Sequence, residues 1–258
     1  MRGYRYAPPV LLGFPRRRSP NITAAPRRAP TLLPVQKPGG GVRWLTRLDP
    51  ADEAAYRAAV TPLVGRIERS LGPEVLAIRT GSGGARRATS WRRARTAWLA
   101  ALRTAVARAP RGTAFAVTDV RACYASIAAD TVHRLLGPEA ASAVVLLRRF
   151  ADEGVRGLPI GPEPSAVLAN AALARLDASL RDAGVRHVRW VDDIVAWGPR
   201  ADVRRALAWL RPEAAWLGLE LHDGKTALLD APGDVRAVVL GRRPSAIGDR
   251  PAGIIAAP

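Results

Sequence analysis

The sequence predicts a mixed α+β fold with antiparallel strand pairs. Two stretches, 32–48 and 187–198, each contain two strand-like runs around a tight turn, which is the pattern of an antiparallel hairpin. Residues 113–120 (TAFAVTDV) predict a further buried strand. Segments with apolar residues at helical spacing lie between these strands. No internal repeat is present, and 258 residues suffice for one large domain or two packed subdomains.

The individual elements follow in order along the chain. Residues 1–30, rich in arginine and proline, predict an irregular basic segment. A helix is expected at 50–72, because an Asp-Pro start signal opens it and Gly72 ends it. A basic loop at 81–90 precedes a second helix at 90–109. The remaining expected elements are the strand at 113–120, helices at 128–137 and 138–154, a rigid loop at 157–165, a helix at 166–184, the second hairpin, a helix at 200–218, the segment 219–230 and a strand at 235–241.

Charge is the strongest global signal. The net charge is +18, and residues 1–100 alone hold nineteen Lys or Arg against five Asp or Glu. Such a balance favours a polyanionic partner, nucleic acid before membrane. The alternative is a compositional bias toward arginine, with the excess charge solvating the surface. Lys37 and Lys225 are the only two lysines in the sequence, and lysine, unlike arginine, can give up its proton.

Several function classes are excluded or disfavoured by composition. No run of 18 or more apolar residues exists, so the sequence predicts no membrane span. The single cysteine, Cys123, excludes an internal disulfide framework and favours a reducing cytoplasm.

Three tryptophans lie on expected amphipathic helices and are predicted to be core residues: Trp98, Trp209 and Trp216.

Two acidic sites stand on strand-like segments. Asp119 ends the strand at 113–120, while Asp192 and Asp193 occupy the predicted turn of the second hairpin. Neighbouring carboxylates repel, and burying them is costly unless something neutralises them. Hard oxygen ligands suit Mg²⁺, and two Mg²⁺ ions about 4 Å apart would stabilise both oxygens of an in-line phosphoryl displacement. The alternative is an exposed Asp-Asp turn, with Asp119 capping the next element.

The order of six motifs resembles that of the reverse transcriptases, in particular the bacterial branch related to group II intron and retron enzymes. A hairpin with Lys37 and Arg43 around a Gly-rich turn comes first. The other five are VTDVRACYASI (117–127), GLPIGPEPSAVLAN (157–170), RWVDDIVAW (189–197), LGLELHDGKT (217–226) and VVLG (238–241). Each is weak alone, and together they span about residues 32–241 in the family's order.

The resemblance implies a right-hand polymerase fold with fingers and a palm, the palm being an antiparallel sheet backed by helices. It implies that Asp119, Asp192 and Asp193 hold two Mg²⁺ ions, with Mn²⁺ as a possible substitute, and that Asp119 and Asp192 are the more certain ligands. Lys225 would protonate the departing pyrophosphate, a general-acid role that arginine cannot fill.

The resemblance also implies a set of nucleotide contacts. Lys37 and Arg43 would clasp the triphosphate, and Arg121 would lie near it. Tyr124 would stack under the incoming sugar and exclude a 2′-hydroxyl. Gly161, in the second palm motif, is likewise expected to contact the nucleotide.

The sequence departs from the family pattern at four places. One is the Pro-Glu-Pro segment at 162–164, which replaces a Ser-Pro pair. Ile160 stands where the family usually has a glutamine that touches template and nucleotide, and Trp190 replaces a Tyr or Phe. After Gly241 seventeen residues remain, rich in proline and glycine, so no helical thumb is expected. The expected organisation is a basic segment at 1–30, fingers at 31–112, a palm at 113–241 and a short tail at 242–258.

The sequence is therefore compatible with two functions. The first is an RNA-directed DNA polymerase that uses an RNA template, a DNA primer and deoxynucleoside triphosphates, with a specialised role such as phage defence. The second is a reverse-transcriptase-like nucleic-acid-binding module with weak or template-independent polymerisation that acts within a larger assembly. In either case the basic N-terminal surface, a partner protein or a second copy is a candidate to take over the grip of a thumb. The alternative is that the sequence is a fragment and that a thumb follows it.

Overall fold

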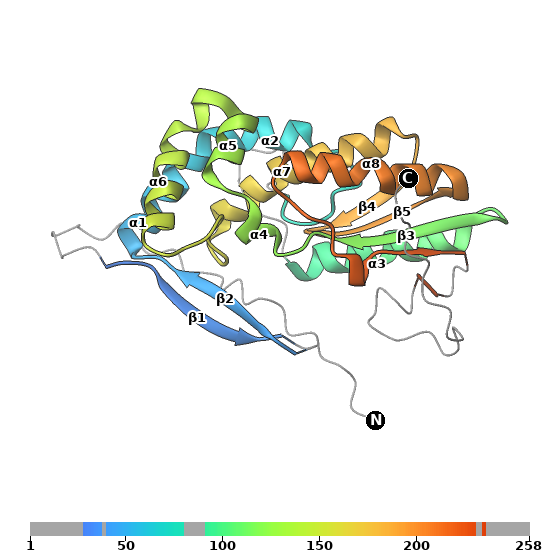
Figure 1. Cartoon of the computed structure of the whole chain (residues 1–258), viewed down its shortest axis with the longest axis horizontal. Coiled ribbons are helices and arrows are strands. Elements are labelled where there is room, and N and C mark those ends of the chain that lie inside the picture. The colour runs from blue at the N-terminus through green and yellow to red at the C-terminus, as the bar shows by residue number, and fades with distance from the viewer. Residues whose placement is uncertain (1–27, 38–39, 80–90, 231–233, 236–258) are drawn as a thin grey trace. The chain divides into compact units, whose positions relative to one another are not determined.

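A computed structural model describes residues 28–37, 40–79, 91–230 and 234–235 (Figure 1). The chain divides into two compact units: Met1–Ile67 with Ala122–Ala172, and Glu68–Arg121 with Leu173–Pro258. Four expected features lie wholly or mostly outside the described residues: the basic segment at 1–30, the loop at 81–90, the strand at 235–241 and the tail at 242–258. The boundaries expected for fingers and palm stay predictions.

The first unit contains the predicted N-terminal hairpin. Strand β1 (Thr31–Gln36) pairs antiparallel with β2 (Val42–Arg47), in a register that sets Thr31 opposite Arg47 and Gln36 opposite Val42. Gly40 and Gly41 both have positive φ, which the chain requires to reverse here. The amide of Lys37 donates to the carbonyl of Gly41 over 3.0 Å, so the turn holds itself closed.

One expected helix of this unit is interrupted. Instead of a continuous helix over 50–72, the chain forms α1 (Pro50–Val60), a 3-10 turn η1 (Thr61–Leu63) and α2 (Val64–Ser70), whose last residues belong to the second unit. Pro62 lies within η1 and has no N–H, so it cannot continue the helical hydrogen-bond ladder. The predicted start is confirmed, since Asp49 accepts a hydrogen bond from the amide of Ala51.

The rest of the first unit is helical. It comprises α4 (Cys123–Ser126), α5 (Ala129–Leu136), η2 (Gly137–Ala140), α6 (Ala141–Asp152) and the first half of α7 (Glu163–Asp182). The buried Tyr56 ring meets Phe150 edge to face at 5.7 Å. The Tyr56 hydroxyl lies 3.1 Å from the buried Ser165 hydroxyl, which satisfies both groups and joins α1 to α7 within the core.

The second unit is built on a four-stranded antiparallel sheet in the order β4-β5-β3-β6. Its strands are β3 (Thr113–Asp119), β4 (Arg186–Trp190), β5 (Asp193–Pro199) and β6 (Ala227–Leu229). Its helices are α3 (Trp91–Arg108), the second half of α7, α8 (Arg200–Trp216) and the short turn η3 (Asp223–Lys225). The predicted mixed α+β fold with antiparallel strands and helices is confirmed.

Alternation along the strands gives this sheet two different faces. Phe115, Val188 and Val195 share one face and pack with Trp98 of α3. Residues one position along each strand, including Arg189 and Ile194, point to the opposite face. Figure 1 shows α3 and α8 on opposite sides of the sheet. Each face is therefore covered, and a side chain at a strand end belongs to one covered face or the other.

Two of the three tryptophans predicted to be core residues are exposed instead. Trp98 is buried as expected, whereas Trp209 and Trp216 of α8 are 48% and 44% exposed. The inward stripe of α8 is taken by smaller side chains: Val203, Ala206, Leu207, Leu210 and Ala214. Amphipathic spacing alone did not distinguish the two apolar stripes of this helix.

Within the described residues, no helix combines the length and apolar character needed to cross a membrane. This agrees with the absence of an apolar run of spanning length in the sequence.

Candidate active site at the end of the four-stranded sheet

Two of the predicted acidic residues face each other across the sheet. Strand β3 pairs with β5 so that Asp119 is the direct partner of Asp193. Directly opposite residues of antiparallel strands have Cβ atoms about 4.5–5.5 Å apart on the same face. Asp119 is 5% exposed and Asp193 is half-buried. Two carboxylates that the sequence separates by more than seventy residues are thus neighbours.

The third carboxylate, Asp192, lies in the turn of the β4–β5 hairpin. Trp190 pairs with Asp193, which leaves Val191 and Asp192 as a two-residue turn. The expectation that Asp192 and Asp193 form the turn is therefore wrong by one residue, because β5 already begins at Asp193. Val191 has φ 54°, a left-handed conformation that a β-branched residue adopts only when its surroundings enforce it.

Lys225 is brought to the acidic residues by a loop that is anchored on β3. The amide of His222 donates to the carbonyl of Asp119 over 2.7 Å, and the amide of Lys225 donates to the carbonyl of His222 over 2.9 Å. The ammonium Nζ of Lys225 donates to Oδ2 of Asp119. A lysine is thus a positive partner of the acidic residues in this structure. The expected role of Lys225 toward the departing pyrophosphate stays a prediction.

Burial and mutual repulsion shift the pKa values of the acidic residues. Burial, together with the charges of Asp193 and Asp119, raises the pKa of Asp192 to about 7. Burial and the charge of Asp119 raise the pKa of Asp193 to about 6, although Lys225 and Arg95 act in the opposite direction. Burial tends to lower the pKa of Lys225, but its hydrogen bond to Asp119 and the surrounding carboxylates raise it overall. Burial and mutual repulsion therefore both disfavour the charged forms of Asp192 and Asp193.

Arg95 is a site residue that sequence reasoning missed. The positive charge of its guanidinium partly opposes the rise in the pKa of Asp193. The guanidinium also stacks over the rings of Trp98 at 4.4 Å and Trp190 at 5.5 Å. Trp190, the residue that departs from the family pattern, therefore supports a cation next to the acidic cluster. Arg95 lies in the basic start of α3, but nothing in its spacing pointed to strand β5.

The donor set fits a hard divalent cation in kind. Three carboxylates offer oxygen ligands, which is the chemistry that Mg²⁺ prefers. Burial, and then the neighbouring carboxylates, raise the pKa values of Asp192 and Asp193. Across the described ranges, however, no group of three or more His, Cys, Asp or Glu side chains converges closely enough to hold a metal ion. Because Lys225 donates to Asp119, its ammonium has to leave that oxygen before a cation can share it.

The residues expected to bind the nucleotide are divided between the two units. Arg121 belongs to the second unit, two residues after Asp119; its side chain is 55% exposed and lies 3.9 Å from Glu220. Lys37, Arg43, Tyr124 and Gly161 belong to the first unit. Of the predicted site residues, the structure brings Asp119, Asp192, Asp193 and Lys225 together, while the nucleotide-binding roles stay predictions.

Within the first unit, the loop at 157–161 supports Tyr124. The amide of Leu158 donates to the carbonyl of Tyr124 over 2.8 Å. Gly157 has φ 62°, and a Cβ there would lie 2.4 Å from the carbonyl oxygen of Tyr124. The amide of Thr46 donates to the carbonyl of Ile160 over 2.7 Å, which ties the same loop to β2. Gly157 is thus a positioning residue that the motif resemblance did not single out.

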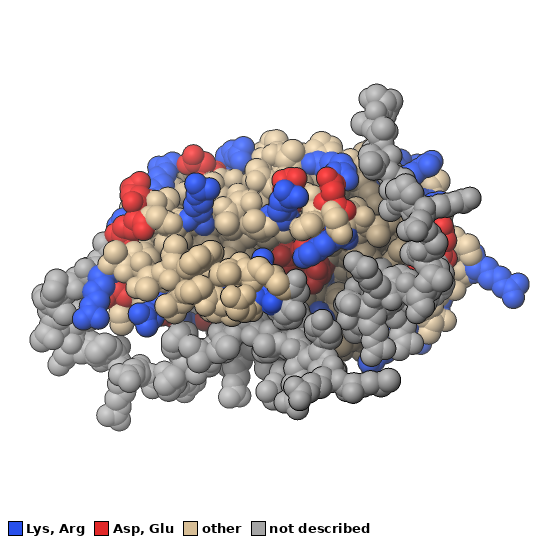
Figure 2. Space-filling view, turned by 60° about the horizontal axis from the view of Figure 1, so that its bottom comes forward, with Lys and Arg blue, Asp and Glu red and all other residues tan. Residues whose placement is uncertain are grey.

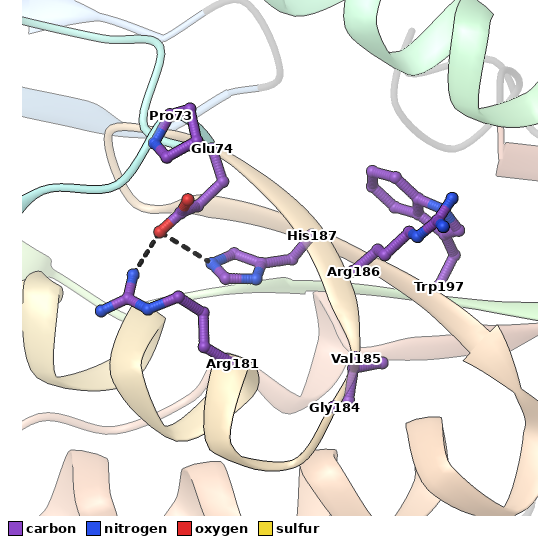
Figure 3. A pocket seen from close by; sticks show the side chains of 8 residues that line it. All are labelled: Pro73, Glu74, Arg181, Gly184, Val185, Arg186, His187 and Trp197. Carbon is purple, nitrogen blue, oxygen red and sulfur yellow. Dashed lines mark hydrogen bonds and ion pairs between the residues drawn. The ribbon is translucent and has the colours of Figure 1, made fainter.

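A separate pocket of about 540 Å³ lies at the outer edge of β4, and its exposed lining is mostly apolar. Figure 3 shows Glu74 between Arg181 of α7 and His187 of β4, with Trp197 at the side. Arg181 forms an ion pair with Glu74, and His187 Nε2 lies 3.9 Å from Glu74 and 3.4 Å from the buried Asp177. The pocket shares no lining residue with the acidic cluster.

On the face shown in Figure 2, Lys and Arg side chains are interspersed with Asp and Glu. Many arginines of the described ranges have an acidic partner, such as Arg57 with Glu163 and Arg66 with Glu139. Several runs of consecutive arginines in residues 1–100, including 16–18 and 86–87, lie outside the described residues. The predicted basic surface of residues 1–100 is therefore not tested by the described part of the chain.

No model of a known protein family matches the chain, and no curated protein matches it. Among solved structures, the chain is similar to telomerase from Candida albicans in complex with a TWJ fragment of telomeric RNA, with a TM-score of 0.47 and 10% identity over 78% of this chain and 42% of that one. It is also similar to apo telomerase from Candida tropicalis truncated from its C-terminal domain, with a TM-score of 0.47 and 11% identity over 78% of this chain and 49% of that one. The chain thus spans less than half of each of these telomerases.

The raised pKa values lead to a prediction about pH and stability. A carboxyl whose pKa is higher in the folded than in the unfolded state stabilises the fold while it is protonated, and that stabilisation is lost as pH rises through the folded value. Without divalent cations at pH 8, Asp192→Asn should therefore raise the free energy of unfolding by about 1–2 kcal/mol. At pH 5 the gain should be clearly smaller, because the folded carboxyl is then protonated and only the cost of protonating the carboxyl that is ionised in the unfolded chain remains. Thermal unfolding at both pH values measures it.

The matched control is Asp182→Asn, which removes an exposed carboxylate of the same unit. It should leave stability unchanged at both pH values. A gain for Asp192→Asn of the same size at pH 5 and pH 8 would contradict the electrostatic origin of the effect.

Proposed function

We propose that this chain is a reverse-transcriptase-type nucleotidyltransferase that extends a DNA primer with deoxynucleotides on an RNA template. The observation that carries the proposal is the juxtaposition of Asp119 and Asp193 across β3 and β5, with Asp192 in the adjoining turn and Lys225 on Asp119. These residues come from three separate motifs of the family that the sequence resembles. The pairing of Asp119 with Asp193 and the bond from Lys225 to Asp119 are expected of a polymerase site. An exposed Asp-Asp turn would not bring these separate motifs side by side.

In this proposal Asp119, Asp192 and Asp193 hold two Mg²⁺ ions, or Mn²⁺ in their place. Such ions, when bound, stabilise the attacking and leaving oxygens of phosphoryl transfer. The carboxylates of this chain supply the negative charge that selects divalent cations. Arg95, stacked on Trp98 of α3 and Trp190 of β4, limits the total charge of the cluster.

Lys225 has two roles in the proposed cycle. Its ammonium neutralises Asp119 in the resting protein. Once released from Asp119, the same ammonium can donate a proton to the departing pyrophosphate oxygen, which would otherwise leave as a more highly charged anion. Its raised pKa means that the ammonium form is present at neutral pH, so the acid is loaded before each addition.

Primer extension tests this proposal directly. Purified chain is incubated with a labelled DNA primer, deoxynucleoside triphosphates and Mg²⁺, with an RNA template, a DNA template or none. Extension that requires both the RNA template and the divalent cation is the expected result. No incorporation under any of these conditions, with Mn²⁺ also tried, would contradict the proposal.

One observation favours a second candidate, a module with weak or template-independent polymerisation. Ile160 occupies the position at which the family usually has a template-touching glutamine, and its backbone is fixed to β2 by the hydrogen bond from Thr46. An isoleucine side chain cannot supply the amide hydrogen bonds of glutamine. Extension that is equal with and without a template would favour this candidate.

A prediction about sugar choice follows from the proposed role of Tyr124. Tyr124→Ala should reduce discrimination against ribonucleotides by about tenfold or more, because the ring that would exclude the 2′-hydroxyl is removed. Deoxynucleotide use should fall only modestly. Competitive incorporation of matched ribo- and deoxynucleotides measures the ratio, and Tyr124→Phe, which keeps the ring, should retain discrimination. Unchanged discrimination in an active Tyr124→Ala protein would show that the assignment is wrong.

A further inference from the structure

Arg189 lies two residues before Val191, the first residue of the β4–β5 turn, and has no exposed surface. It belongs to β4, and its side chain points to the sheet face opposite to that of Asp119 and Asp193. A buried guanidinium is costly unless all its donors are satisfied. The partners that satisfy it therefore report what the fold uses this residue for.

One side of the guanidinium is held by α7. Nε of Arg189 donates to Oδ1 of Asp177 over 2.9 Å, and Nη2 donates to Oδ2 over 2.8 Å. Asp177 is fully buried as well. This two-pronged arrangement sets both the position and the plane of the guanidinium, because the fork of arginine matches the two oxygens of a carboxylate.

The third nitrogen of the guanidinium, Nη1, bonds to the turn. Nη1 of Arg189 donates to the carbonyl oxygen of Val191 over 2.9 Å. Val191 is the residue with φ 54°, and Asp192 follows it directly. The backbone of Arg189 is fixed too, since its amide donates to Glu74 over 2.9 Å and its carbonyl accepts from Leu76 over 3.1 Å. The strained turn is thus tied to an anchor that is rigid on two sides.

We propose that the Arg189–Asp177 pair is a positioning device that holds Val191 in its left-handed conformation and thereby sets the direction of the Asp192 carboxylate. Neither residue touches the reacting atoms. The consequence for metal binding rests on the proposed function, whereas the hold on the turn does not. The alternative is an ion pair that only stabilises the contact between α7 and β4.

Two double variants separate these possibilities. Arg189→Met with Asp177→Leu removes both charges and replaces them by apolar side chains of similar length, a change that buried ion pairs often tolerate without loss of stability. The bond to the Val191 carbonyl is lost all the same. The matched control is Arg181→Met with Glu74→Leu, which removes the neighbouring ion pair seen in Figure 3, a pair whose side chains make no hydrogen bond to the turn within the described residues.

Three measurements are made on each purified protein without nucleic acid: thermal unfolding, hydrogen exchange of the amides of residues 191–193, and Mg²⁺ or Mn²⁺ affinity by calorimetry. The Arg189/Asp177 variant should unfold within a few degrees of wild type. Its turn amides should exchange at least about tenfold faster, and its metal affinity should fall about 10–100-fold, as for other residues that orient metal ligands. The control should match wild type in exchange and affinity.

A stable Arg189/Asp177 variant with wild-type exchange at the turn and wild-type metal affinity would overturn the proposal. If the wild-type protein itself binds neither metal, the proposed function fails, and the exchange rates alone then decide whether Arg189 holds the turn.

Discussion

Asp119→Asn should abolish templated primer extension, lowering its rate by at least about a thousandfold, while leaving the fold intact. The amide has the same shape as the carboxylate but lacks the charge that Lys225 and a divalent cation would share. Asp119 is also the central member of the cluster, since its charge raises the pKa of both Asp192 and Asp193. The rate is measured in single-turnover primer extension, and folding is checked by circular dichroism and thermal unfolding.

The control for this substitution is again Asp182→Asn, an exposed carboxylate of the same unit that lies on α7, outside the acidic cluster. It should extend primers at the wild-type rate. A folded Asp119→Asn protein that retains extension within about tenfold of wild type would remove Asp119 from the catalytic machinery.

Gly157→Ala should be the most destabilising single substitution considered for the first unit, with a loss of about 2–3 kcal/mol in the free energy of unfolding. The added Cβ would lie 2.4 Å from the Tyr124 carbonyl oxygen and 2.5 Å from that of Ala125, and backbone atoms cannot yield as a flexible side chain can. The φ of 62° adds strain for any residue with a Cβ. Chemical denaturation of the purified variant measures the loss.

Gly154→Ala provides a matched comparison in the same unit. Gly154 also has positive φ, at 91°, but a Cβ there would meet nothing within 4 Å. It should therefore show the backbone strain alone, about 1 kcal/mol. Equal losses for the two variants would mean that the clash with Tyr124 is relieved by a shift of the loop.

The strands, turns and helices that depend on local sequence pattern were predictable from the sequence. The hairpins around the Gly-rich turn and around Asp192, the strand ending in Asp119 and the helices at 91–108 and 200–216 all appear near their expected bounds. Alternation of period two and the Pro, Gly and Asp signals act over a few residues, so they survive without knowledge of tertiary contacts. The break at Pro62 was missed because its flanks both fit one helical pattern.

The partners across the sheet were decided by tertiary structure. The motif order indicated that Asp119, Asp192 and Lys225 belong together, but the opposition of Asp119 to Asp193, the turn at Val191–Asp192 and the hydrogen bond from Lys225 depend on strand register. Register follows from which faces are buried and from long-range pairing. Neither quantity can be read from residue spacing in a single chain.

The arginines that support the site could not be identified from the sequence. Arg95 and Arg189 are two among thirty-eight arginines, and composition does not distinguish them from the exposed majority. Burial separates them: Arg189 is buried against Asp177 of a distant helix, while Arg95 stacks on two tryptophans beside Asp193. The sequence by itself determined which chemical groups the site would contain. Only the packing of α3 and α7 on the two faces of the sheet decided which cations meet them, because the energy of a charge depends on its neighbours in space and on its exclusion from water.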